Sequence, residues 1–160
     1  MEPLARSLGA TKGSFYWHFR GRDELLEAAM ALWERRETDA VIAEVEVEAT
    51  PVQRLERLVE RVLSSTPARA GETALHAGNA EPIVSDALAR VAARRIAYVQ
   101  ALLCEAGLPD AEADRRAHLV YAMVLGLDAF GTALPDRLPV GEQRPAWAAS
   151  LVAMVLSGGP

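Results

Sequence analysis

Cysteine is almost absent from this sequence of 160 residues, because Cys104 stands alone. A single thiol excludes an internal disulfide and a metal site built from several cysteines, so a reducing cytoplasm is the simplest compartment to expect. Long hydrophobic runs are also missing. The most apolar run, Leu119–Leu127, has half of the roughly 18 apolar residues that a membrane span needs. The first residues, MEPLARSLGA, do not resemble a signal peptide.

Lysine is equally scarce, since Lys12 is the only one and arginine supplies the other 16 of the 17 basic residues. The net charge of −5 argues at first against a nucleic-acid partner. Its distribution is uneven, however. Residues 1–22 carry four basic residues against the single acidic Glu2, a net charge of +3, which leaves −8 for the rest of the chain. A small basic head on an acidic body is compatible with local contact to a polyanion, because screening makes near charges count most.

The residues that are abundant indicate helices. Ala, Leu, Arg and Glu dominate, and the shares of 51% hydrophobic and 24% charged residues fit a globular protein rather than a disordered one. We therefore expect an all-α protein. Apolar residues at helical spacing predict helices at 23–46, 51–65, 82–106, 111–134 and 146–156, with shorter ones at 1–7 and 11–19 and an ambiguous segment at 68–80.

The segment TKGSFYWHFRGRDELL is unusually rich in aromatic residues, with four of the chain's nine in five consecutive positions. On a helix, Phe15 and Phe19 share one face and should pack inward. Tyr16, Trp17 and His18 point elsewhere, and each has a polar group that can reach a phosphate oxygen. A small hydrophobic core would explain the first pair well and the outward set poorly.

The same segment has the layout of a helix-turn-helix. A turn at Gly9-Ala10 joins two short predicted helices, and Thr11 is a good N-cap for the second. In this motif the second helix enters the major groove of DNA, with its N-terminal end toward bases and phosphates. Two hydroxyls, one cation and a close backbone approach suit that end, and the residues that provide them are Thr11, Lys12, Gly13 and Ser14.

The longer stretch LGATKGSFYWHFRGRDELLEAAM resembles the recognition-helix region of the TetR/AcrR transcriptional regulators. The resemblance implies a ligand-responsive regulator, a repressor by family default, that binds operator DNA as a homodimer. It implies base and phosphate contacts by the helix start at 11–14, backbone contacts by the three outward residues, and a further phosphate contact by Arg22. The DNA-binding residues would be Thr11, Lys12, Gly13, Ser14, Tyr16, Trp17, His18 and Arg22.

The resemblance also assigns roles to the rest of the chain. Residues 1–46 would form a partial helix-turn-helix domain with its connecting helix, and residues 47–160 a ligand-binding and dimerisation domain. The family has a helix before LARSLG that packs against the recognition helix, and the present sequence begins after it. We therefore expect the head to be poorly ordered or unable to bind DNA in this form. The alternative is a dimeric helical small-molecule-binding protein that has lost DNA binding through N-terminal truncation.

Candidate ligand contacts are large or polar groups on otherwise apolar faces. They are Trp33, His76, Tyr98, Met123, Asp128 and Phe130. Each has an alternative interpretation as a core or surface residue, and the surroundings suggest an apolar or aromatic ligand with one or two polar groups. The helix at 119–130 is apolar on more than one face, which favours a homodimer through the two C-terminal helices but also fits a central core helix.

We expect no enzyme, no cofactor and no metal. The three histidines, His18, His76 and His118, share no metal-ligand spacing. His18 has a second interpretation as a general base, but no paired carboxylate or nucleophile lies near it in the sequence. Cys104 lies within an apolar helix, where a thiol usually serves in packing.

Overall fold

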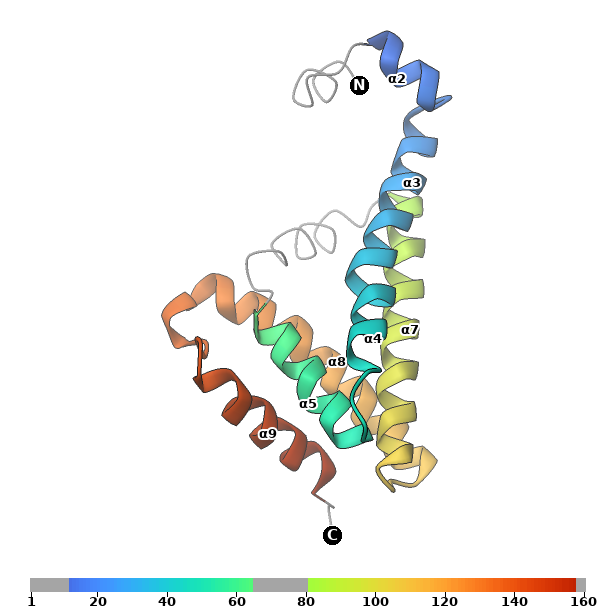
Figure 1. Cartoon of the computed structure of the whole chain (residues 1–160). Helices are drawn as coiled ribbons and strands as arrows, with labels where there is room; N and C mark the ends of the chain where they lie inside the picture. The colour runs from blue at the N-terminus through green and yellow to red at the C-terminus, as the bar shows by residue number, and fades with distance from the viewer. Residues whose placement is uncertain (1–11, 65–80, 158–160) are drawn as a thin grey trace.

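The computed structural model describes residues 12–64 and 81–157, and within these ranges every regular element is helical (Figure 1). This confirms the all-α prediction. The elements are α2 (Lys12–His18), α3 (Arg22–Glu34), the π-helical turn η1 (Arg35–Asp39), α4 (Ala40–Val45), α5 (Pro51–Ser64), α7 (Pro82–Glu105), α8 (Asp110–Ala133), the 3-10 turn η2 (Pro135–Arg137) and α9 (Gln143–Leu156). The helix predicted at 1–7 and the ambiguous segment at 68–80 lie outside the described residues.

Helix α7 begins and ends where the sequence indicates. Pro82 occupies its first position, where a missing N–H costs nothing. At the other end Gly107 adopts a positive φ of 102°. The N–H of Gly107 donates to the carbonyl of Cys104 at 2.9 Å, and the N–H of Leu108 donates to that of Leu103 at 3.1 Å. These two bonds form a Schellman motif, which stops the helix and satisfies its last carbonyls.

Helix α9 begins earlier than the sequence suggests. Residues up to Pro145 were predicted as a loop, but α9 starts at Gln143. Pro145 then lies in the first turn of the helix. Amide groups there have no partner within the helix, so a proline is tolerated. The helix therefore begins two residues before Pro145 rather than after it.

Two apolar clusters hold the helices together, and α7 belongs to both. The larger one joins α5, the second half of α7, α8 and α9, and consists of Leu55, Val59, Leu63, Val99, Leu102, Leu103, Ala113, Ala117, Ala148 and Val152. The smaller one joins α3 to the first half of α7, through Met30, Val84, Ala87 and Leu88. Helix α7 thus connects the body of the molecule to the segment that leads to α2.

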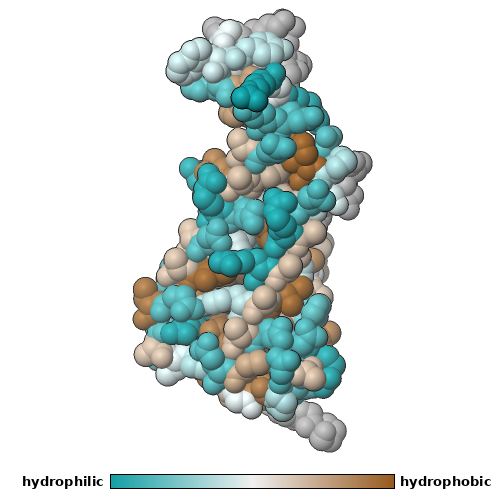
Figure 2. Space-filling view, turned by 90° about the vertical axis from the view of Figure 1, so that its right-hand side faces the viewer, coloured by the Kyte–Doolittle hydropathy of each residue, from teal (hydrophilic) through white to brown (hydrophobic). Residues whose placement is uncertain are grey.

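Helix α2, the part of the head that the structure describes, is set apart from this body. Helix α2 lies at the end of α3, while α3, η1 and α4 form one rod alongside α7 (Figure 1). Seen from the side of α3 and α7, the head is narrow above a broader body, and apolar residues are scattered among hydrophilic ones (Figure 2). The rod had been predicted as one helix, and η1 is an interruption that its apolar periodicity does not reveal.

Candidate nucleic-acid interface and ligand cavity

Helix α2 presents its polar and aromatic side chains to solvent. Gly13, Ser14 and His18 are exposed, and the exposed fractions of Tyr16 and Trp17 are 55% and 82%. The Trp17 and His18 rings meet edge to face, with centroids 4.6 Å apart. Phe19, just after the helix, is half-buried.

Three side chains of this segment lie outside what the structure describes. Thr11 lies outside the described residues, and of Lys12 the structure describes the backbone, which begins α2. The side chain of Phe15 is likewise not described, so its inward packing stays a prediction.

Arg22 connects the head to the body. Its guanidinium donates two hydrogen bonds to the carboxylate of Glu81, each of 3.0 Å, and so joins the start of α3 to the residue before α7. This bidentate bond raises the pKa of Arg22 and lowers that of Glu81. Since Arg22 is more than half exposed, a DNA phosphate could reach it, but it would compete with Glu81 for the guanidinium.

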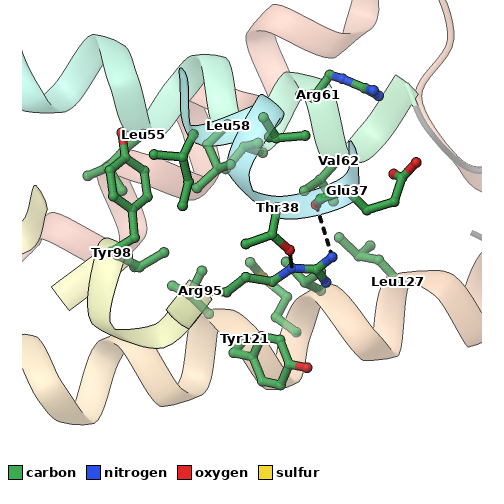
Figure 3. Close-up of a pocket in the computed structure, with 17 residues that line it drawn as sticks. Glu37, Thr38, Leu55, Leu58, Arg61, Val62, Arg95, Tyr98, Tyr121 and Leu127 are labelled. Atoms are coloured by element: carbon green, nitrogen blue, oxygen red, sulfur yellow. Dashed lines mark hydrogen bonds between the residues drawn. The ribbon is translucent and has the colours of Figure 1, made fainter. Parts of the chain in front are cut away.

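A cavity opens between η1, α4, α5, α7 and α8, with a volume of about 100 Å³ (Figure 3). Most of its wall consists of Val, Leu, Ile and Met side chains. The polar residues on the wall are Glu37, Thr38, Arg61, Arg95, Tyr98 and Tyr121. A mostly apolar cavity with a few polar groups is the usual form of a site for a small organic ligand.

Arg95 is hydrogen-bonded to two other residues of the cavity wall. Its Nε donates to the Thr38 hydroxyl at 3.1 Å and its Nη2 donates to the carbonyl of Glu37 at 3.0 Å, as the dashed lines in Figure 3 mark. Its guanidinium carbon lies 5.7 Å from the centroid of the Trp33 ring, within the range of a cation–π contact. Arg95 therefore joins α7 to the π-helical turn.

Tyr98 connects α7 to the end of α4. Its hydroxyl donates to the carboxylate of Glu46 at 2.6 Å. The pKa of Tyr98 is raised well above its ordinary value of 10. The main cause is burial of the phenol, and the second is the hydrogen bond to the negatively charged Glu46. The folded state therefore holds the phenol proton more tightly than the unfolded chain does.

This raised pKa predicts a loss of stability in alkali. A group with a raised pKa stabilises the fold fully below its unfolded value, and this contribution is lost as the pH rises from about 10 toward the folded pKa. We expect the melting temperature to fall less between pH 8 and about pH 11 in Tyr98→Phe than in the wild type. The control is Tyr16→Phe, which removes an exposed hydroxyl. Equal alkaline losses in all three proteins would contradict the prediction.

The ligand contacts predicted from the sequence are only partly brought together. Tyr98 and Met123 line the cavity. Trp33 instead packs beside the α3–α7 cluster beneath Arg95, and Phe130 is exposed and away from the cavity wall. His76 lies outside the described residues, and the side chain of Asp128 is not described.

Sequence reasoning missed Glu37, Thr38, Arg61, Arg95 and Tyr121 as lining residues. Only Arg95 carries a signal in the sequence, because a charged residue interrupts the apolar stripe of the helix at 82–105. The other four residues lie on elements that pack together only in the folded structure, and the sequence pattern does not predict which helices make contact.

In the described ranges, no three His, Cys, Asp or Glu side chains gather in a way that could hold a metal ion. Across the same residues, no helix combines the length and apolarity needed to cross a bilayer.

The structure thus has an exposed helix at the end of a rod, joined to a helical body that contains a cavity, an arrangement compatible with a helical DNA-binding protein. The family model described as "Bacterial regulatory proteins, tetR family" matches residues 1–29. No curated protein and no solved structure matches the chain. The match confirms the resemblance seen in the sequence and supports a DNA-binding transcriptional regulator of the TetR type.

Proposed function

We propose that the protein is a cytoplasmic repressor that binds operator DNA as a homodimer through α2 and releases it when a small molecule enters the cavity. The observation that carries the proposal is the exposure of Tyr16, Trp17 and His18 together on α2, within the stretch matched by the family model. The polar groups of these exposed side chains suit contact with DNA phosphates. Residues 1–46 would serve DNA binding, and residues 47–160 ligand binding and dimerisation.

The course of the main chain supports coupling between the two sites. Residues of η1 and α4 line the cavity, and the same rod continues through α3 to α2. A ligand that prefers one position of the rod would change the spacing of two recognition helices in a dimer, and thereby the affinity for an operator with fixed half-site spacing.

Exposed apolar side chains on the C-terminal helices support the homodimer. Leu119 on α8 and Met154 on α9 are 69% and 62% exposed and share a shallow hollow between the two helices. Val120 and Leu127 of α8 pack against the core instead. One face of α8 thus contributes to the core while Leu119 stays uncovered, as a subunit interface requires.

The proposed DNA contacts predict a loss of operator affinity in two variants. We expect Trp17→Ala to weaken binding about 10-fold to 100-fold, because each protomer loses a contact worth about 1 kcal/mol. Lys12→Ala should also reduce the slope of log affinity against log salt by about 2, since about one phosphate contact disappears from each half-site. Fluorescence anisotropy with labelled DNA from upstream of the coding region, titrated at several salt concentrations, measures both effects.

The matched control is Val47→Ala, because Val47 is 81% exposed, like Trp17, but lies between α4 and α5. It should bind DNA as the wild type does. Binding by the wild type that does not change with salt would reject the operator contacts. A wild type that dimerises and binds ligand but not DNA would favour the alternative, a dimeric small-molecule-binding protein without DNA binding.

A further inference from the structure

The rod that joins the head to the cavity contains one turn of altered helical geometry. In η1 the N–H of Ala40 donates to the carbonyl of Arg35, five residues back, where an α-helix would use the carbonyl four residues back. A π-helical turn is equivalent to one residue inserted into an α-helix. If this turn became regular, everything before it would turn by about 100° and shift by about 1.5 Å relative to everything after it.

Arg95 of α7 binds this turn through two hydrogen bonds. Thr38, within η1, is 2% exposed and is the one fully buried polar residue that the described part of the chain contains. Its hydroxyl accepts the 3.1 Å hydrogen bond from Arg95 Nε, and the adjacent carbonyl of Glu37 accepts the 3.0 Å bond from Nη2. A buried hydroxyl without a partner is costly, so the two bonds favour the π-helical geometry over alternatives that move Thr38.

The same guanidinium borders the cavity. Arg95, Thr38 and Glu37 all belong to its wall, which is otherwise largely aliphatic (Figure 3). The charged residues on the wall are two arginines, Arg61 and Arg95, and one glutamate, Glu37, a net charge of +1. Arg61 lies 3.5 Å from Glu44, toward the outside of α5. The cavity therefore combines an apolar surface with a positively charged fork at the point where it meets η1.

We propose that Arg95 both recognises the effector and holds the π-helical turn, and that the effector is a small apolar carboxylate. This inference rests on the proposed function. A carboxylate matches the planar fork of an arginine in two parallel hydrogen bonds, and its negative charge adds a Coulomb attraction to the guanidinium that a neutral acceptor lacks. The Thr38 hydroxyl and the Glu37 carbonyl are neutral, so a carboxylate in the cavity displaces them from Arg95. Released from Arg95, the turn becomes free to change register and to move α3 and α2.

The first test needs no ligand. Arg95→Met keeps an unbranched apolar side chain in place of the arginine stem and removes the guanidinium donors, and we expect backbone amides at 35–42 to exchange with deuterium about tenfold faster than in the wild type. The matched control is Arg94→Met, because Arg94 is the neighbouring residue on α7 and also contacts η1, but through an exposed ion pair with Asp39 at 3.5 Å. Unchanged exchange in Arg95→Met, or equal increases in both variants, overturns the proposal.

Thr38→Val provides a second variant that keeps the shape of the buried side chain. It removes one acceptor of Arg95 while leaving the arginine in place, so it reports on the turn even if Arg95→Met does not fold. We expect faster exchange at 35–42 again, and exchange as slow as in the wild type would count against Arg95 as the residue that holds η1.

The second test uses octanoate and octan-1-ol, which have the same hydrocarbon length and differ in the head group. Isothermal titration should show octanoate binding the wild type at least about tenfold more tightly than the alcohol, and a ratio near one in Arg95→Met. Equal affinity of the two probes for the wild type, or no octanoate binding at roughly 1 mM, overturns the carboxylate assignment. Operator binding is measured separately, so a protein that shows the exchange and probe effects but never binds DNA rejects the proposed function alone.

Discussion

Leu103→Ala is expected to lower the free energy of unfolding by about 2–5 kcal/mol. Leu103 is completely buried on α7, in the cluster that joins α5, α7, α8 and α9. Truncation removes apolar contacts and leaves a cavity that close-packed helices fill only in part. For a chain of this size the melting temperature should fall by roughly 4–20 °C. Urea denaturation, followed by circular dichroism at one fixed protein concentration, measures the change without interference from dimerisation.

Leu32→Ala is the matched control, because Leu32 is also a leucine within an α-helix, α3, but is exposed. It should change stability by less than about 1 kcal/mol, since little apolar surface is lost and alanine favours the helix. A Leu103→Ala protein as stable as Leu32→Ala would mean that α7 does not form the centre of the body.

The elements that the sequence predicted well have local chemical causes. Pro82 and Gly107 delimit α7 because of what proline and glycine do to the backbone, and both effects act within a few residues. The DNA-binding segment could also be predicted from the sequence, since the motif that identifies it is an order of neighbouring residues. The family match at residues 1–29 agrees with it.

The cavity could not be predicted in the same way, because it forms where η1, α4, α5, α7 and α8 meet, and these elements extend over residues 35–133. Tyr98 and Met123, two of the predicted ligand contacts, line the cavity, but Trp33 has the same kind of surroundings in sequence and lies beneath Arg95 instead. The π-helical turn was missed for a related reason. Its stabilising bonds come from Arg95, which follows Thr38 by 57 positions, so the local pattern around Thr38 contains no sign of it.

Leu119→Glu combined with Met154→Glu is expected to convert the proposed dimer into a monomer. The two side chains are largely exposed in the single chain and border the same hollow of α8 and α9. In a two-fold dimer the same patch appears on both protomers, so four carboxylates would meet at the interface. Burying charges of one sign without partners costs several kcal/mol, and we expect the dimer to dissociate at least about 100-fold more readily.

Light scattering coupled to size-exclusion chromatography measures this change, and Val47→Glu is the control because Val47 is exposed and belongs to the segment between α4 and α5, not to α8 or α9. The monomer should keep its helical circular dichroism, since the substituted side chains contribute little to the core. Operator affinity should fall together with dimerisation, because a monomer presents one recognition helix and loses the gain from two linked half-sites. A double variant that remains dimeric would place the interface elsewhere, and one that is monomeric yet binds operator unchanged would show that DNA recognition needs only one protomer.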